Sequence, residues 1–165
     1  MRKFGLKPLI NEESEVLILG AFPSDLSLSQ AQYYANRTND FWKLLGAVLK
    51  EPLTGATYET RVQTLLAKKI GLWDVYRSCA RPGSMDRDIS DREFNDFRVL
   101  KTIAPHLRLV CFNGKEAGKS EVLAGQLGYR TRILPSSSGA NRKHQGRRLN
   151  EWKKCCAEVL HLRDG

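Results

Sequence analysis

The sequence predicts an α/β fold, a three-layer α/β/α domain whose central sheet has four strands and is mainly parallel. Four short apolar runs, at residues 16–19, 70–75, 107–112 and 130–134, are bounded by glycine, proline or polar residues and have the length of strands. Helical patterns lie between these runs. Alternating strands and helices indicate βαβ units, which form a parallel sheet with helices on both faces.

Three segments outside the strands show apolar residues at helical spacing. The first face is formed by Tyr58, Val62, Leu65 and Leu66, the second by Phe94, Phe97, Leu100 and Ala104, and the third by Leu149, Trp152, Cys156, Val159 and Leu160. Phe41 and Trp42 have the spacing of a further buried helix face. No repeat or linker interrupts the pattern, so we expect one domain over residues 1–165.

The four cysteines contain no Cys-x-x-Cys pair, and two of them are adjacent. This spacing suits neither a zinc site nor an iron–sulfur cluster, so we expect reduced, buried thiols, no bound metal and no cofactor. The N-terminus lacks the apolar segment of a signal peptide, and no apolar run is long enough to span a bilayer. We therefore expect a protein of the cytoplasm and nucleoid, or of a eukaryotic nucleus, without a membrane partner.

The formal net charge is +9. This excess of Lys and Arg predicts attraction to a polyanion, with DNA or RNA as the first choice. Two basic stretches, at residues 142–148 and 153–154, would supply salt-sensitive affinity for a nucleic-acid backbone. The alternative is a solvated helix face whose charge only keeps the protein in solution.

In such a fold, ligands bind outside the carboxyl ends of the strands. The first strand is followed by the glycine- and proline-containing segment 20–24, and then by Tyr33 and Tyr34 beside Asn36 and Asn39. An aromatic pair next to amides on a loop is what a base-stacking pocket needs. The first strand end is therefore a candidate binding site.

The second strand contains Asp74 among apolar residues. Because an unpaired carboxylate is costly there, Asp74 needs backbone donors, a cation or a functional water, and a structural hydrogen-bonding role is favoured. The turn that follows, at residues 81–84, is rich in donors but is a weak phosphate site by itself.

Asn113 and Gly114 follow the third strand. Asn-Gly is ordinary turn chemistry, but a carboxamide also matches the acceptor and donor that deamination places side by side on uracil and hypoxanthine. Both interpretations stay open for Asn113. After the fourth strand, Ser136, Ser137 and Ser138 lead into a basic helix start, where hydroxyls and backbone N–H groups suit a phosphate.

Together these segments resemble the uracil-DNA glycosylase superfamily and, within it, the hypoxanthine-type branch that acts on deoxyinosine. The resemblance covers residues 16–152 and rests on GAFPS at 20–24, YY at 33–34 with NDFW at 39–42, LWDV at 72–75 with RPGS at 81–84, FNG at 112–114 and LPSSS at 134–138. It implies a uracil-DNA glycosylase-like fold and a monofunctional glycosylase of base-excision repair. Such an enzyme hydrolyses the N-glycosidic bond of hypoxanthine, uracil or xanthine in DNA, and we expect it to act as a monomer.

The resemblance also implies roles for individual residues. Most of the superfamily has Asp, Asn or Glu before the proline of the first motif, where this chain has Phe22. The hypoxanthine-type branch shares this gap, and its pattern moves the water-positioning role to Asn39. The same pattern places Phe22 in the base pocket, gives Tyr34 the stacking face and gives Asn113 the contact with the base edge.

Further contacts implied by the resemblance are with the DNA backbone and with the emptied base stack. The serine triplet is expected to bind phosphate through Ser136, Ser137 and Ser138. The start of the basic stretch would fill the emptied stack with Asn141, Arg142 or Lys143. This chain departs from its relatives at Arg37 and Gly139, positions where proline is common.

A carboxamide is no useful base near neutral pH, so Asn39 is expected to orient a water rather than to deprotonate it. Asp74 is the reserve candidate for handling the water. Two other functions stay open. One is a damaged-DNA-binding module without catalysis, which the loss of an acidic residue at Phe22 favours; the other is a nucleoside-handling enzyme on the same fold.

Overall fold

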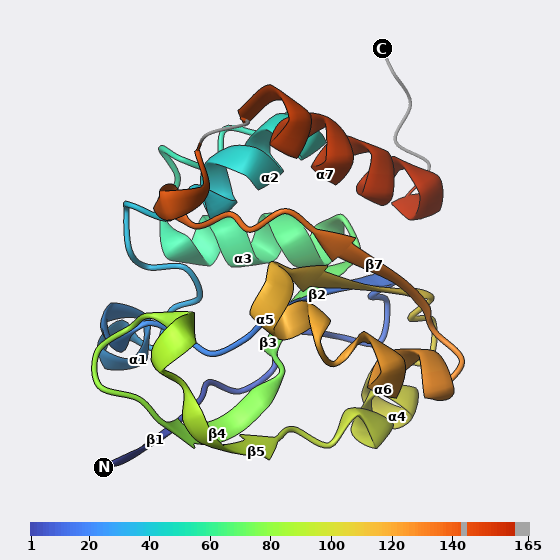
Figure 1. Cartoon of the computed structure of the whole chain (residues 1–165). Helices are drawn as coiled ribbons and strands as arrows, with labels where there is room; N and C mark the ends of the chain where they lie inside the picture. The colour runs from blue at the N-terminus through green and yellow to red at the C-terminus, as the bar shows by residue number, and fades with distance from the viewer. Residues whose placement is uncertain (143–144, 161–165) are drawn as a thin grey trace.

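The computed structural model describes residues 1–142 and 145–160 (Figure 1). Its central sheet consists of β2 (Val16–Gly20), β3 (Ile70–Asp74), β6 (Leu109–Asn113) and β7 (Arg130–Leu134), in the order β3-β2-β6-β7. All pairings within this sheet are parallel. The predicted four-stranded, mainly parallel sheet is therefore confirmed, and the strand ends differ from the prediction by only one or two residues.

The burial of the strands explains their sequence pattern. β2, β3 and β6 are buried along their whole length, because helices cover both faces of the sheet, and such strands are continuously apolar rather than alternating. β7 is an edge strand, and most of its side chains are exposed.

Helices form the two outer layers, so the predicted three-layer fold is confirmed. They are α1 (Asp25–Gln30), α2 (Phe41–Leu49), α3 (Tyr58–Ala67), α4 (Leu100–Ile103), α5 (Lys115–Gly118), α6 (Glu121–Gln126) and α7 (Gln145–Leu160), with short 3-10 turns η1 (Asp86–Asp88), η2 (Phe97–Val99) and η3 (Gly139–Asn141). α2, α3 and α7 pack on one face of the sheet, and α4, α5 and α6 on the other (Figure 1). None of the described helices has the length and apolarity needed to cross a membrane.

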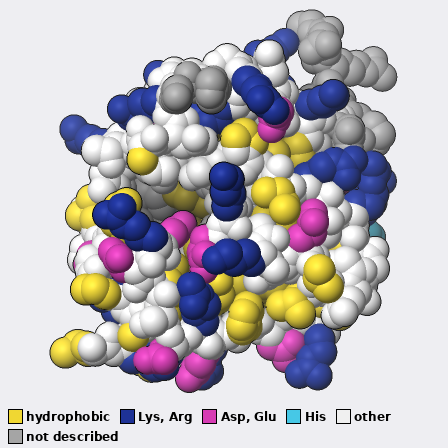
Figure 2. Space-filling model, viewed as in Figure 1, with side chains coloured by type: hydrophobic (Ala, Val, Ile, Leu, Met, Phe, Trp, Pro, Cys, Tyr) yellow, Lys and Arg dark blue, Asp and Glu magenta, His cyan; other side chains and the backbone are white. Residues whose placement is uncertain are grey.

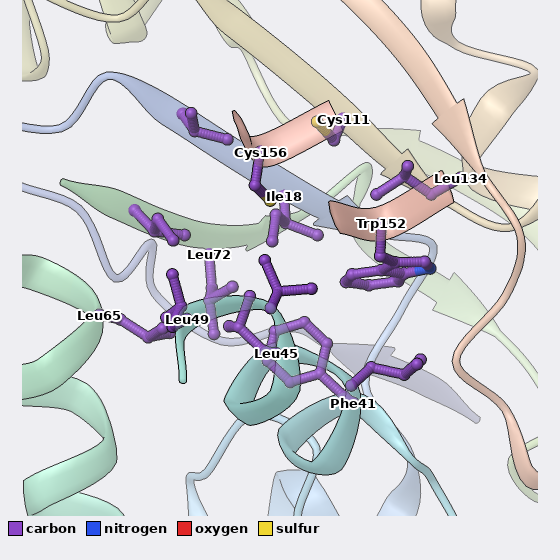
Figure 3. Close-up of a cluster of buried hydrophobic side chains, with 14 of the residues drawn as sticks. Ile18, Phe41, Leu45, Leu49, Leu65, Leu72, Cys111, Leu134, Trp152 and Cys156 are labelled. Atoms are coloured by element: carbon purple, nitrogen blue, oxygen red, sulfur yellow. The ribbon is translucent and has the colours of Figure 1, made fainter. Parts of the chain in front are cut away.

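The side chains of β2 alternate between two hydrophobic cores. Val16 and Ile18 pack with α2, α3 and α7, whereas Leu17 and Leu19 pack with the opposite layer. In the first core, the rings of Phe41 from α2 and Trp152 from α7 meet with centroids 5.9 Å apart (Figure 3). The start of α2 is thereby held against the sheet. All four cysteines are free and buried.

Two features of the fold were not predicted. One is a second, antiparallel sheet of β1 (Arg2–Phe4), β4 (Tyr76–Ala80) and β5 (Ser90–Phe94), in the order β1-β4-β5. The other is α1, which lies between segment 20–24 and Tyr33 and begins at a Ser24 cap that accepts a hydrogen bond from the Ser27 N–H.

The prediction of a helix face that begins at Phe94 was wrong at its start. Phe94 ends β5 and its side chain is 49% exposed. Helical structure begins only at Phe97, after Asp96, whose carboxylate accepts a hydrogen bond from a backbone N–H two residues on and so caps the turn. Phe97, Leu100 and Ala104 are buried as predicted.

Because the central strands are parallel, their carboxyl ends lie along one edge of the sheet. Gly20 pairs with Asp74, and Asn113 pairs with Leu134. The four polar segments that follow these strands are therefore brought to the same edge, although they are far apart in the sequence.

Candidate active site

A pocket of about 350 Å³ opens at the carboxyl edge of the sheet, a volume within the range of small-molecule sites. It is lined by residues from 20–24, 33–39, 84–87 and 136–139, together with Ser27, Asp74 and Asn113. The molecular face in Figure 2 has a hollow at this place, with Lys and Arg side chains around it and a few Asp and Glu side chains between them. All four strand ends thus contribute to one site.

A directional chain of hydrogen bonds joins Asn39, Ser137 and Asn113, and we call it the amide chain. Asn113 Nδ2 donates to Ser137 Oγ at 2.9 Å, and Ser137 Oγ donates to Asn39 Oδ1 at 2.7 Å. The backbone N–H of Phe41 donates to the same Oδ1 at 2.9 Å. Because a backbone N–H can only donate, the Asn39 carboxamide is fixed with its oxygen toward the protein.

The fixed orientation of Asn39 decides what this side chain can offer to the pocket. Both lone pairs of Oδ1 are used, and within the described part of the chain Nδ2 has no hydrogen-bond partner. Asn39 therefore presents an amide donor to a ligand rather than an acceptor.

The Asn113 carboxamide is also held in one orientation. The Ser137 N–H donates to Asn113 Oδ1 at 2.9 Å, and the second Nδ2 hydrogen of Asn113 goes to the Tyr34 hydroxyl at 3.1 Å. The Tyr34 ring stacks on Phe41 at 3.9 Å between centroids, with 12° between the planes. Burial, followed by the charge of Asp74, raises the pKa of Tyr34, so its hydroxyl stays protonated.

An ion-pair cluster around the buried Asp40 carboxylate ties the loop before α2 to the loop after β7. Arg142 binds both carboxylate oxygens of Asp40 at 2.9 Å, and Arg148 Nη2 binds Asp40 Oδ2 at 2.7 Å. Arg148 Nη1 also donates to the carbonyls of Ser136 and Ser138 at 3.3 Å. Hydrogen bonds from Arg142 first, and then from Arg148, hold the pKa of Asp40 well below its usual range, against the opposing effect of burial.

Gly139 is the point of closest approach between these two loops. A Cβ at residue 139 would overlap the Thr38 carbonyl oxygen, so any larger residue would push the loops apart. The close contact with Thr38 therefore requires glycine at this position. Arg37, the second departure, is exposed.

The other side of the pocket is built around Asp74, whose side chain is 4% exposed. Its Oδ2 is buried without a hydrogen-bond partner. A Cβ on Gly20 would lie 2.7 Å from Asp74 Oδ1 and 3.0 Å from the Tyr34 hydroxyl, so only glycine lets these two groups reach the pocket floor. Burial, followed by the nearby Asp86 carboxylate, raises the pKa of Asp74 to about 7 against the smaller opposing effect of Arg81.

Phe22 forms the wall next to Asp74, and the buried Arg81 side chain supports it from behind. The Arg81 guanidinium lies 5.2 Å from the centroid of the Phe22 ring. Its Nη2 donates to the Pro23 carbonyl at 2.5 Å and its Nε to the Gly83 carbonyl at 2.8 Å, while Nη1 is buried without a partner. Arg81 therefore fixes the segment that carries Phe22.

Comparison with known proteins assigns the chain to a family. The sequence model of the uracil DNA glycosylase superfamily matches residues 7–160. The chain belongs to this superfamily. A hypoxanthine DNA glycosylase of Methanosarcina acetivorans is 48% identical over 153 residues, covering 93% of this chain and 97% of the relative. A hypoxanthine DNA glycosylase of Methanosarcina barkeri is 47% identical over 152 residues, covering 92% and 96%.

A solved structure agrees with this assignment. The solution NMR structure of a candidate uracil DNA glycosylase from Methanosarcina acetivorans matches with a TM-score of 0.89 and 46% sequence identity. The match covers 98% of this chain and 100% of that one. The uracil-DNA glycosylase-like fold predicted from the motifs is thus shown by both family and structure.

The structure brings most of the predicted site residues together. Those that line the one pocket are Phe22, Tyr34, Asn39, Asp74, Asn113, Ser136, Ser137 and Ser138. Asn141 and Arg142 are exposed on the adjoining loop, where Asn141 Nδ2 donates to the Ser136 carbonyl at 3.0 Å. Lys143, the third candidate for filling the stack, lies outside the described residues.

Two expectations need correction. Ser137 was grouped with the phosphate-binding hydroxyls, but it is completely buried and its hydroxyl belongs to the amide chain, so it cannot meet a phosphate. Arg148 was grouped with the solvated basic stretch, but it is 4% exposed and is bound to Asp40. Sequence reasoning missed the Asp40 cluster, and its only signal was an acidic residue directly before an apolar helix.

Residues 85–87 were also missed as part of the pocket. They follow the donor-rich turn at Arg81 and cross to the mouth of the pocket through η1. Within the residues that the structure describes, no group of His, Cys, Asp and Glu side chains is placed to hold a metal ion.

Proposed function

We propose that this protein is a DNA glycosylase that takes hypoxanthine out of the base stack and hydrolyses its N-glycosidic bond. The observation that carries the proposal is the amide chain of Asn39, Ser137 and Asn113 inside one pocket at the strand ends. The superfamily supplies the reaction class, and the names of the two archaeal relatives support hypoxanthine as the base. A deaminated base is mispaired, which lowers the free energy needed to flip it.

Asn39 is proposed to orient the attacking water. Because its Oδ1 is filled, it would hold the water by donation from Nδ2 and would leave a second water lone pair free to attack the sugar. A carboxamide cannot take the proton of that water near neutral pH. The glycosidic bond must therefore stretch first toward an oxocarbenium-like sugar, and the contribution of Asn39 is to hold the water in the position of attack.

Asn113 and Tyr34 are proposed to read the base edge. Both amide hydrogens of Asn113 are bound within the protein, which leaves one acceptor position on Oδ1 for an N–H of the base. The Tyr34 hydroxyl accepts from Asn113, so its own hydrogen is available to a base carbonyl. This donor and acceptor pair fits the adjacent C=O and N–H of hypoxanthine. Phe22, with Arg81 behind it, would supply an apolar surface for the ring.

The DNA backbone is proposed to run across the rim formed by Ser136, Ser138 and the exposed residues Asn141 and Arg142. The hydroxyls can meet phosphate oxygens, and the side chain of Asn141 or Arg142 could enter the emptied stack. The net charge of +9 supports attraction to DNA. We also propose that the enzyme acts as a monomer, in the compartment that holds the DNA.

The test is an alkali-cleavage assay on labelled oligonucleotides that carry hypoxanthine, uracil or xanthine at one position. We expect cleavage at hypoxanthine at the highest rate, and a loss of cleavage in Asn39→Ala. Binding without cleavage at any base would favour a silent DNA-binding module. Faster hydrolysis of free deoxyinosine than of the oligonucleotide would favour a nucleoside-handling enzyme. Either result would overturn the proposal.

A further inference from the structure

The Asp74 carboxyl group is not explained by the role of Asn39 or by the fold. It ends a fully buried strand, lines the pocket and is 4% exposed, yet Oδ2 has no hydrogen-bond partner. A carboxylate with a structural role would be surrounded by donors, because burying it without them is costly. The Asp74 carboxyl group therefore keeps unused hydrogen-bonding capacity at the pocket that it lines.

Within the part of the chain that the structure describes, no cation forms an ion pair with this carboxyl group. Arg81 is the nearest basic side chain that affects it, but two of the Arg81 nitrogens are bound to backbone carbonyls, and among the described residues no ion pair involves Asp74. The other titratable groups that face it are Tyr33, Tyr34 and Asp86. Two neutral phenols and a second carboxylate do not favour a negative charge on Asp74.

These surroundings keep a proton on Asp74 at a pH where most carboxyl groups have lost theirs. Burial and Asp86 raise its pKa to about 7. A group that titrates near the working pH is suited to general acid catalysis, because it is protonated often enough and still transfers its proton readily. The position of Asp74 in the pocket and its raised pKa thus both suit a general acid.

The leaving base needs such a proton. When the C1′–N9 bond of a deoxyinosine residue breaks, its electron pair stays on the purine, and the departing anion is much easier to form if a ring nitrogen is protonated. N7 is the most basic ring nitrogen that the intact nucleotide offers. Asn113 Oδ1, being an acceptor, cannot supply this proton.

We propose that Asp74 is the general acid that protonates the departing hypoxanthine at N7; this rests on the proposed function. The Asp74 O–H proton moves to N7 while the C1′–N9 pair moves onto the base, which leaves as neutral hypoxanthine. The water held by Asn39 then bonds to C1′ through oxygen and returns one proton to the Asp74 carboxylate. The sum is one water consumed, one base released and one abasic sugar formed.

Single-turnover excision rates measured from pH 5 to pH 9 test this step. For the wild type, we expect the rate to fall about tenfold per pH unit above the pKa of about 7. Asp74→Asn keeps the shape of the side chain but has no acidic proton, so its rate should be about 10²–10⁴-fold lower and independent of pH in this range. Asp88→Asn, at an exposed position that does not line the pocket, is the matched control with wild-type behaviour.

A second substrate identifies the proton acceptor. 7-Deazahypoxanthine keeps the same C=O and N–H edge but has a carbon at position 7. The wild type should excise it as slowly as Asp74→Asn excises hypoxanthine, and Asp74→Asn should show no additional loss with it. Because this comparison can be made with the wild type alone, it does not depend on the folding of the variant.

The outcomes separate the two proposals. If the wild type leaves hypoxanthine in DNA intact, the proposed function fails. If the wild type excises hypoxanthine but Asp74→Asn retains its rate and pH profile, Asp74 is not the acid. If 7-deazahypoxanthine is excised as fast as hypoxanthine, or if the losses from Asp74→Asn and from 7-deazahypoxanthine multiply, proton transfer to N7 is overturned.

Discussion

The two walls of the pocket use their polar atoms in different ways. The braced wall consists of Asn39, Asp40, Asn113, Ser137 and Arg148, whose side chains bind one another, and Arg148 Nε is its one buried side-chain atom without a partner among the described residues. The open wall consists of Asp74 and residues 84–87, with Arg81 behind it, and two of its side-chain atoms are buried and unpaired: Asp74 Oδ2 and Arg81 Nη1. The side chains of the braced wall are thus held in fixed orientations, whereas the open wall keeps polar atoms without hydrogen-bond partners.

The walls also differ in the kind of contact that holds them. Ser137 and Asn39 are 98 residues apart in the sequence, and Arg148 and Asp40 are 108 apart, so the braced wall is held by side-chain bonds between segments that only the fold brings together. On the open wall, Arg81 also reaches a distant segment, the Pro23 carbonyl 58 residues away, as well as the Gly83 carbonyl two residues on, but none of these bonds involves the Asp74 side chain. The proposed position of the catalytic water thus depends on side-chain bonds between distant segments, whereas the open wall leaves Asp74 Oδ2 without a partner.

The largest loss of stability should come from breaking the brace with Arg148→Met. Removing one partner of a buried ion pair leaves the other charge uncompensated, which typically costs about 3–5 kcal/mol of unfolding free energy, and Arg142 should keep the loss near the lower value. Urea unfolding measures it. The control is Arg147→Met, because Arg147 is 77% exposed and its ion pair with Glu151 is at the surface, and it should cost less than about 1 kcal/mol. Equal losses in the two variants would show that the brace does not stabilise the fold.

On the open wall, Asp74→Asn should raise the stability of the protein, by an amount that depends on pH. The folded chain keeps the Asp74 proton up to a pKa of about 7, above the ordinary 3.8, so the stability contribution of Asp74 is fully present below about pH 4 and is lost as the pH rises to about 7. Asn does not titrate. Relative to the wild type, Asp74→Asn should therefore gain stability between pH 4 and pH 8, on the order of 4 kcal/mol at about 1.4 kcal/mol per pKa unit.

Thermal unfolding of both proteins at pH 4.5, 6 and 8 measures this difference. At pH 8 the Asp74→Asn variant should melt at the higher temperature even though it is the slower enzyme. A difference in melting temperature that stays constant with pH would mean that the Asp74 carboxyl group is not perturbed in the folded protein.

On the braced wall, Asn39→Ala should slow chemistry without weakening DNA binding. Removing one preorganised polar group of an active site typically costs about 10²–10³ in rate. Single-turnover excision of hypoxanthine gives the rate, and anisotropy with the same oligonucleotide gives the affinity. Asn150→Ala on the exposed face of α7 is the control. A variant as fast as the wild type would remove Asn39 from the mechanism.

The sequence predicted elements that have a local apolar pattern, and it did not predict elements without such a pattern or bonds between distant side chains. The central strands were recognisable because strands buried on both faces form continuous apolar runs, and their parallel order placed Gly20, Asp74 and Asn113 at one edge. β5 was missed because all its residues are exposed, so it has no apolar run to mark it. The bond from Arg148 to Asp40 has no local signal, and in a basic stretch Arg148 resembles a solvated side chain.

The smallest effect should come from the rim of the open wall, at Arg87. This side chain is exposed, lines the pocket, and has no ion-pair partner within residues 1–142 and 145–160. It is therefore free to neutralise one phosphate. Arg87→Gln should weaken DNA binding a few-fold and lower the slope of log affinity against log salt by about 0.9, with an unchanged excision rate at saturating enzyme.

Anisotropy titrations at several salt concentrations, in the Asn39→Ala background to prevent turnover, measure this slope. Arg77→Gln is the matched control, because Arg77 is exposed on β4 but already pairs with Glu93 at 2.8 Å, so it should leave the slope unchanged. If Arg87→Gln instead lowers the excision rate and leaves the salt slope intact, then Arg87 acts on the base or the sugar. In that case the open wall would supply a cation to the reaction as well as the Asp74 proton. Residues 84–87 would then belong to the catalytic part of the pocket and not only to its rim.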